Sequence, residues 1–351
     1  MKIDLAFEQI IAEDTSKIAY CRQELFQIFL ILWIKKEYKN EKLSGIGTYQ
    51  NAESRFYHIC KDLVSKKVIF GFNHSTKGYS FFIKNSDKSF TLEQISCAIY
   101  PYGYVSFLTA MNLYQLSNIK SSAIYYTTFN RQKWKTISVK DFLNNFNKIG
   151  LSFKKEAEDF EYLKKEDPEA YDYLFSSRQI NFKTIDSNRL YSYQSVIPSY
   201  PVEDPFSELF KNSEFSKSLI VHTKKTLDEH EWWGNVRLQN INDLFLDMLR
   251  YPQYCGGLTH VLEVYKNHIE KYLDDVITTI MVNGTLIDKA RFGFFLEKCL
   301  NHKSQILEDW KKEQVDKRGG SRKLVSTLDF DQTFDPDWNI SINHDEFKKF
   351  I

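Results

Sequence analysis

Apolar residues recur at helical spacing near the start of the chain, and a strand-like pattern follows them. Over residues 51–65 they occupy positions i, i+3, i+4, i+7 and i+8 of an amphipathic helix: Phe56, Ile59, Cys60, Leu63 and Val64. Two short aromatic and β-branched runs follow at 68–72 and 79–83, separated by a polar stretch that ends in Gly78. They predict a β-hairpin. With a helix expected over 19–36, the order is helix, helix, hairpin.

The rest of the chain alternates helical and strand-like patterns. Helices are expected over 91–99, 104–116, 138–146, 258–282 and 286–300. Strands are expected over 123–128 and around Val236 and Leu238, directly before another helical run. This mixture predicts an α+β fold, in which an amino-terminal helix and hairpin unit precedes a larger mixed α/β domain.

The segment 242–257 has the sharpest local pattern in the chain. Leu244, Met248 and Tyr251 lie along one helical face. Pro252 ends that helix, and two glycines at 256–257 allow a sharp turn into a second helix. No catalytic side chain lies at the turn, so the element is expected to be structural.

Asp247 and Arg250 lie within one turn of this helix. They are expected to form a surface ion pair worth a few tenths of a kcal/mol. The alternative is a contact that specifies the fold. Neither reading makes them catalytic.

Composition and charge limit the function classes. The 351 residues include 28 Phe and 21 Tyr, which predicts two or three domains with aromatic cores. Net charge is +1, so binding to nucleic acid has to be argued locally. Residues 35–88 hold eleven Lys and Arg against five Asp and Glu, a surplus of six that would attract a duplex.

The cysteines and the apolar runs bear on location. Five scattered cysteines, with no Cys-x-x-Cys pair, are typical of reduced thiols in a cytoplasm. The most apolar run, 25–34, has about half the length that crosses a bilayer. A cytoplasmic protein without a membrane partner is therefore expected.

The order helix, helix, hairpin is that of a winged helix, in which the second helix enters the major groove and the hairpin tip contacts phosphates. The residues expected to contact DNA are Asn51, Ser54, Arg55, Tyr57, His58, Lys61, Lys66, Lys67, His74 and Lys77. A second basic run is expected to be a flexible linker. The alternative is a contact with nucleic acid or an acidic partner through Lys317, Arg318, Arg322 and Lys323.

Catalytic and metal sites find little support in the sequence. Asp329, Asp331 and Thr333 have the spacing of a phosphatase nucleophile motif, but only 18 residues follow, too few for the remaining groups. An exposed acidic turn is expected there. The histidines show no metal-ligand spacing, and no Gly-x-Ser-x-Gly elbow occurs. We expect no catalytic residue, metal or cofactor; an enzyme acting on nucleic acid would need a cluster that the sequence does not reveal.

Three segments carry a family resemblance. They are DMLRYPQYCGG at 247–257, YGYVSFLTAMNLYQLSN at 102–118 followed by a strand, and DKARFGFFLEKC at 288–299. Together and in this order they resemble AbiEi-type antitoxins of abortive-infection toxin–antitoxin systems. The charged segment 154–172 and the long carboxyl-terminal part are additions to the family's pattern.

The resemblance implies an organisation and a function. It implies a winged-helix domain over 1–88, an AbiEi-like domain over 89–302 and a tail over 303–351. It implies repression of the protein's own operon by binding inverted repeats of double-stranded DNA in the promoter. It also implies an antitoxin, active in phage defence, against a nucleotidyltransferase toxin, with no stable complex assumed. The alternative is a non-catalytic protein-interaction module whose winged helix no longer binds DNA.

Overall fold

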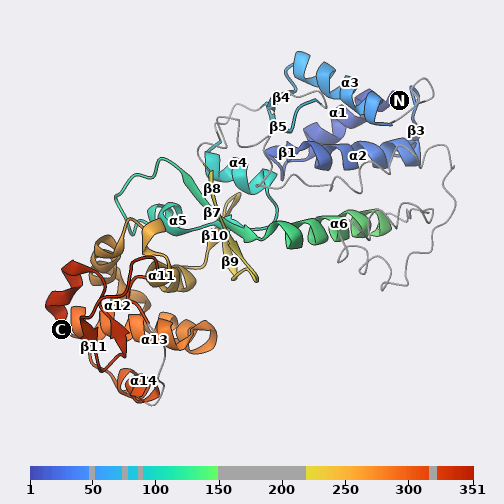
Figure 1. Cartoon of the computed structure of the whole chain (residues 1–351). Coiled ribbons are helices and arrows are strands. Elements are labelled where there is room, and N and C mark those ends of the chain that lie inside the picture. Colours follow the sequence, from blue (N-terminus) through green and yellow to red (C-terminus); the bar gives the residue numbers. More distant parts are fainter. Residues whose placement is uncertain (47–51, 73–77, 86–89, 149–218, 316–321) are drawn as a thin grey trace. The chain divides into compact units, whose positions relative to one another are not determined.

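The chain forms two compact units of mixed helices and strands, in agreement with the expected α+β class (Figure 1). The computed structural model describes residues 1–46, 52–72, 78–85, 90–148, 219–315 and 322–351. The first unit comprises 1–103 and 128–227, and the second comprises 104–127 and 228–351. The expected charged segment 154–172 lies outside the described residues.

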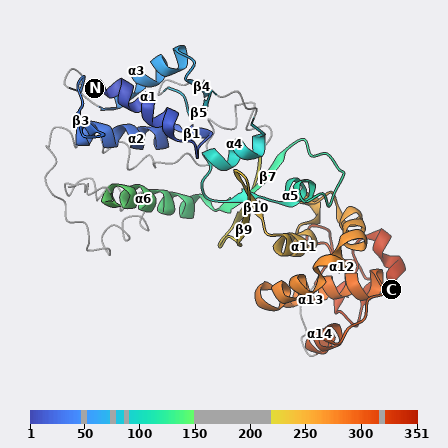
Figure 2. The same cartoon turned by 180° about the vertical axis from the view of Figure 1, so that it is seen from behind.

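The first unit begins with three helices and a small sheet. Its elements are α1 (Ile3–Glu13), β1 (Ala19–Cys21), α2 (Arg22–Lys35), β2 (Glu37–Tyr38), β3 (Glu41–Lys42), α3 (Ala52–Ser65), β4 (Ile69–Phe72) and β5 (Phe81–Lys84). Strands β1, β5 and β4 form an antiparallel sheet in that order. The expected hairpin is therefore present, and Figures 1 and 2 show α1, α2 and α3 beside it.

The helix expected over 19–36 was too long at its amino end. Residues 19–21 are extended, because Tyr20 pairs with Phe82 of β5 across the sheet. The helix begins only at Arg22. The apolar pattern of this run suits a buried strand as well as a buried helix, and only the pairing with a distant strand decides between them.

Aromatic rings form the core of this part of the first unit. The Phe56 ring, on α3, lies 5.1 Å from Phe26, 5.7 Å from Phe29 and 6.1 Å from Phe7, measured between ring centroids. All four rings are buried. Edge-to-face contacts of this kind fix the angles at which α1, α2 and α3 pack.

The remaining described elements of the first unit are α4 (Leu92–Ile99), α6 (Arg131–Lys148) and β8 (Leu219–Lys224). Thr91 and Gln94 form a capping box at the start of α4. On α6, Trp134 is fully buried, and its ring lies 4.8 Å from Tyr102. The Tyr102 hydroxyl donates to Asp141 on the same helix, at 2.6 Å.

The second unit is built on four strands. These are β6 (Tyr104–Val105), most of β7 (Ile124–Phe129), β9 (His230–Trp233) and β10 (Val236–Gln239), four strands of a five-stranded sheet that neighbour one another in the order β7-β6-β10-β9. Only β6 and β10 run parallel. The helix expected over 104–116 is correspondingly shorter: α5 (Phe107–Leu113) begins after β6.

Helices follow the sheet of the second unit. They are α11 (Ile241–Arg250), the short 3-10 turn η2 (Pro252–Tyr254), α12 (Leu258–Asn283), α13 (Leu286–Gly293), the π-helical turn η3 (Phe294–Cys299) and α14 (Gln305–Val315). Gly256 and Gly257 have left-handed φ angles of +85° and +94°. The expected break at Pro252 and the glycine turn are both present.

The described parts of 303–351, the segment expected to be a tail, belong to the second unit. It supplies α14, β11 (Phe334–Asp335), β12 (Ile340–Ser341) and the 3-10 turn η4 (Asp345–Phe350). Trp338 is fully buried, and its ring covers Gly293 so closely that a Cβ added to that glycine would lie 2.0 Å from it. Apolar side chains of this segment, Trp338 among them, complete the core of the second unit.

Among the helices described, none has both the length and the apolar character required to cross a membrane.

Candidate nucleic-acid interface

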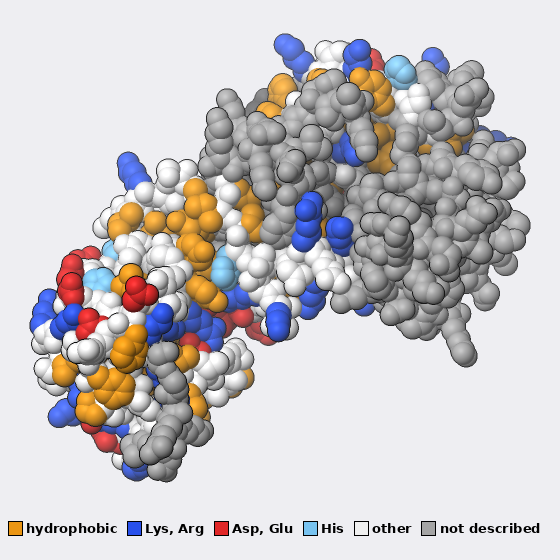
Figure 3. Space-filling view, viewed as in Figure 1, with side chains coloured by type: hydrophobic (Ala, Val, Ile, Leu, Met, Phe, Trp, Pro, Cys, Tyr) orange, Lys and Arg blue, Asp and Glu red, His pale blue; other side chains and the backbone are white. Residues whose placement is uncertain are grey.

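One face of α3 is exposed and polar. The helix buries Ala52, Phe56, Ile59, Cys60 and Leu63 against the core. The side chains that it exposes are Ser54, His58, Lys61, Asp62 and Ser65. The polar face expected from the sequence is therefore the outer face, and Figure 3 shows basic side chains over it.

Arg55 is held by α1 and does not stand free on that face. Its guanidinium forms an ion pair with the carboxylate of Asp4, and its side chain is only 15% exposed. Contact with a phosphate or a base edge would require it to leave Asp4. Arg55, one of the residues expected to contact DNA, thus stabilises the packing of α3 on α1.

Lys66 is also partly neutralised. Its ammonium lies 2.7 Å from Asp62 and 4.0 Å from Glu8 of α1. The hydrogen bond to Asp62 raises the pKa of Lys66. Asp4 and Glu8 were missed as part of this surface, because the charge count began at residue 35. Their spacing of four on an amphipathic run at the amino terminus is the signal that would have found them.

Lys61 and Lys67 are the clearest cations of the surface. Both are exposed, and neither pairs with a carboxylate in the part of the chain that is described. Lys67 lies just past the end of α3, with a left-handed φ of +57°. The amides of Lys67 and Val68 donate to the carbonyls of Val64 and Leu63, the pattern of a Schellman motif. The motif fixes the backbone that carries the Lys67 side chain.

The β4–β5 hairpin packs against α3 at Tyr57. Gly78, with a φ of +92°, lies so close that an added Cβ would be 3.0 Å from the Tyr57 ring. The same ring lies 5.7 Å from His58. Tyr57 is therefore partly used in packing. Asn51, His74 and Lys77, which were also expected to contact DNA, lie outside the described residues.

The second basic run has a structural role in its described part. The Arg322 guanidinium donates to the side chain of Gln314 on α14. The Lys323 ammonium donates to the Leu328 carbonyl at 2.7 Å, and Arg291 donates to the Lys323 carbonyl at 2.9 and 3.1 Å. These contacts attach the segment to the second unit. Lys317 and Arg318 lie outside the described residues.

Asp247 and Arg250 belong to a buried network, which corrects the expected surface pair. Asp247 is 1% exposed and accepts a hydrogen bond from Gln239 at 2.7 Å. Arg250 lies 3.5 Å from Asp247 and binds the buried Asp288 with both Nε and Nη2. Burial raises the pKa of Asp288, but the hydrogen bonds and charge of Arg250 and the hydrogen bonds from Thr285 together outweigh it, so the pKa is lowered. The alternative reading, a contact that specifies the fold, suits this geometry.

The acidic segment near the end of the chain forms a turn. Asp331 accepts hydrogen bonds from the Thr333 amide and from Lys348, at 2.8 and 2.7 Å. The hydrogen bond from Lys348 contributes most to lowering the pKa of Asp331 to about 2. Asp329 is exposed. No group of three His, Cys, Asp or Glu with metal-binding geometry occurs among the residues that the structure describes.

Comparison with known proteins identifies no relative. No family model matches the chain, and neither the curated proteins nor the solved structures contain a match.

Proposed function

We propose that the chain is a DNA-binding autorepressor and antitoxin of a toxin–antitoxin operon. The arrangement that supports this most is the first unit: α1, α2 and α3, an antiparallel β1-β5-β4 sheet, and an outward polar face on α3. A winged helix has this order of elements, and its third helix is the one that enters the major groove. In this proposal α3 reads the duplex and the β4–β5 hairpin is the wing.

The charges on that face suit a weak, salt-sensitive electrostatic contact. Lys61 and Lys67 are available for phosphates, and two such contacts would give log K a slope of about −2 against log salt. Ser54 and His58 are exposed on the same helix and carry groups that hydrogen-bond to bases. Sequence selection would then depend on these side chains and not on Arg55.

The antitoxin role rests on the resemblance of three segments to AbiEi-type antitoxins. The cognate toxin is a nucleotidyltransferase encoded by the gene next to the one for this chain. No stable complex between the two proteins is assumed. All five cysteines are free thiols, which suits the reducing cytoplasm in which such a pair acts. The gene next to this one is the direct check on the partner.

A mobility-shift assay with the DNA upstream of the chain's own gene tests the repressor. We expect retention of that fragment in preference to a scrambled fragment of equal length, with affinity that falls as salt rises with a slope of about −2. Equal retention of both fragments, or none at micromolar protein, would contradict the proposal.

A specific observation favours the second candidate, a non-catalytic protein-interaction module. Asp4, Glu8 and Asp62 neutralise Arg55 and Lys66 on or beside α3. A surface with this balance of charges also suits a protein partner. Absence of any DNA retention, in a chain that still melts cooperatively, would favour this alternative.

A further inference from the structure

Two of the three segments that resemble the antitoxin family meet in one aromatic cluster of the second unit. The Phe107 ring, at the start of α5, lies 6.2 Å from Tyr125 on β7, 5.8 Å from Tyr251 and 5.2 Å from Tyr254. Tyr251 and Tyr254 belong to the turn between α11 and α12. We call these four residues the tyrosine cluster. The tyrosine cluster has no role in the DNA binding proposed for the first unit.

The centre of the cluster has an unusual backbone. Phe107 is fully buried and has a left-handed φ of +49°, a conformation that bulky side chains rarely adopt. Two hydrogen bonds hold the backbone where β6 passes into α5. The Ser106 amide donates to the Tyr125 carbonyl, and the Phe107 amide donates to the side chain of Gln239. Such conformations persist where packing enforces them, and they concentrate at ligand-binding positions.

Each of the three tyrosines is half-buried. Tyr251 and Tyr254 are close to parallel, with an angle of 25° and 6.2 Å between centroids. Tyr125 lies 5.9 Å from Tyr254. At these separations the rings contact one another and leave no room for a cation between them. A ligand must therefore pack on their outer surface, which favours a flat one.

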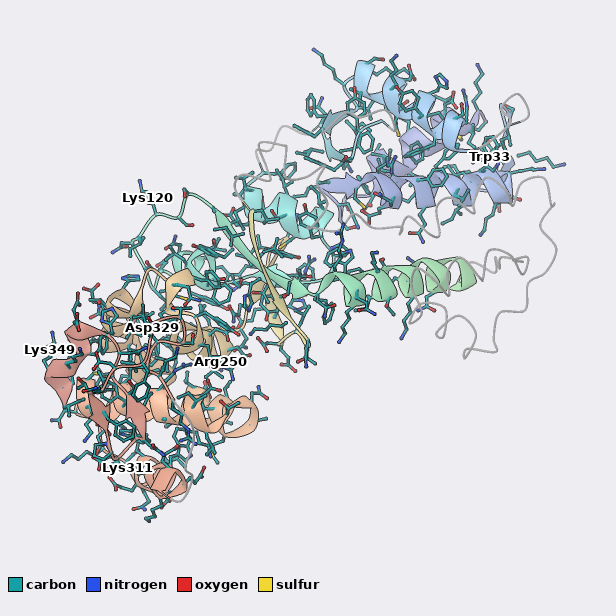
Figure 4. All side chains as sticks on the ribbon, in the orientation of Figure 1. Trp33, Lys120, Arg250, Lys311, Asp329 and Lys349 are labelled. Atoms are coloured by element: carbon teal, nitrogen blue, oxygen red, sulfur yellow. The ribbon has the colours of Figure 1, made fainter. Side chains whose placement is uncertain are left out.

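The two loops that border the cluster carry little charge. The two bordering loops, 117–123 and 251–257, contain one charged residue, Lys120, and no Asp or Glu. Ile119 lies against Gly256, where an added Cβ would be 3.1 Å from Ile119 Cδ1, so the two loops adjoin. Lys120 is exposed and forms no ion pair with any described residue. Figure 4 labels Lys120 on the segment between α5 and β7.

We propose that the tyrosine cluster and Lys120 bind a single-stranded nucleic acid. Unpaired bases stack on the tyrosine rings, and Lys120 contacts a phosphate of the same strand. A duplex is a poor ligand, because its base faces are covered by neighbouring bases and only their edges are open. The site lies wholly in the second unit and does not depend on the surface of α3.

Fluorescence anisotropy of a fluorescein-labelled twelve-nucleotide oligouridylate, titrated with the full chain at low salt, tests the proposal. Tyr125→Leu removes a ring and should weaken binding about tenfold, whereas the matched Tyr125→Phe, which keeps the ring, should bind within about twofold of the parent. Lys120→Glu should also weaken binding, and the salt slope should fall by about 0.7. Lys303→Glu, at another exposed lysine of the same unit, should have little effect.

Several outcomes would overturn the proposal. Parent-like affinity in both Tyr125→Leu and Lys120→Glu would exclude this surface. Loss of binding in a Lys61→Ala, Lys67→Ala double variant would place the oligonucleotide-binding site on the first unit. No binding by the parent chain would leave the cluster as a protein-docking surface. If Tyr125→Leu fails to fold, Lys120→Glu decides alone, because its side chain is exposed. Promoter retention is measured separately, so failure here is distinct from failure of the repressor proposal.

Discussion

Arg250 holds Asp288 through two parallel hydrogen bonds, Nε to Oδ1 at 3.0 Å and Nη2 to Oδ2 at 2.8 Å. The pair joins the end of α11 to the start of α13, 38 residues apart in sequence. Asp288 also accepts from the Thr285 amide and hydroxyl, so the same carboxylate caps α13. The Arg250–Asp288 pair thus fixes how α11 packs against α13, and it also caps the start of α13.

Removal of Arg250 should therefore be costly. Arg250→Ala leaves Asp288 and Asp247 buried without their cation, and we expect the free energy of unfolding to fall by about 3 kcal/mol. Urea unfolding of the full chain measures this. Lys312→Ala is the matched control, because Lys312 is 74% exposed in its pair with Asp309, and an exposed pair contributes less than about 1 kcal/mol. Equal losses in the two variants would contradict a structural role for Arg250.

The Arg250–Asp288 pair should make the free energy of unfolding depend on pH. Hydrogen bonds and charge from Arg250 and the hydrogen bonds from Thr285 together outweigh burial and place the folded pKa of Asp288 below its ordinary value of 3.8. A group with a lowered folded pKa contributes stability above the unfolded pKa and loses it as pH falls through that value toward the folded one. Unfolding free energies measured from pH 6 down to pH 3 should fall over the lower part of this range. Asp288→Asn should reduce that fall, and an unchanged slope would show that other carboxylates cause it.

Gly256 should tolerate no β-branched side chain. Its φ is +85°, and an added Cβ would lie 2.8 Å from the His260 ring and 3.1 Å from Ile119. Gly256→Val combines backbone strain with a clash, and we expect a loss of about 3 kcal/mol. Gly257→Ala is the control for strain without a clash: its φ of +94° and ψ of 162° are essentially confined to glycine, which costs about 1–3 kcal/mol, but nothing lies within 4 Å of the added Cβ. Thermal melts of both variants separate the steric clash from the backbone strain. Equal melting temperatures would mean that the neighbours of Gly256 move aside and that the clash costs nothing.

Local patterns in the sequence predicted much of this fold. The polar face of α3, the β4–β5 hairpin and the Pro252 break depend on residues close together in the chain, so their spacing is informative. The strand at Ala19–Cys21 could not be found in this way. It forms because Tyr20 pairs with Phe82, and a short apolar run does not reveal so distant a partner.

At the candidate site too, local spacing predicted exposure but did not predict contacts between residues far apart in the chain. Exposure of Lys61 followed from helical spacing, whereas the capture of Arg55 by Asp4 joins residues 51 apart. The burial of Asp247 depends on Gln239 and Arg250 together, although its i, i+3 spacing from Arg250 suggested a surface pair. Charge counts along the sequence treat every ion as solvated, and they fail where the fold places an opposite charge beside it.

DNA binding by α3 gives the last prediction. Lys61→Ala with Lys67→Ala removes two exposed cations, and promoter affinity in the mobility-shift assay should fall while the melting temperature stays unchanged. The slope of log K against log salt should become less steep by about 2, one contact for each lysine. Arg55→Ala should behave differently: it leaves Asp4 without its partner, so stability falls and affinity changes little at a temperature where the variant is folded. A large loss of affinity in Arg55→Ala alone would mean that the guanidinium exchanges Asp4 for DNA. Unchanged affinity in the double-lysine variant would place the DNA surface away from α3.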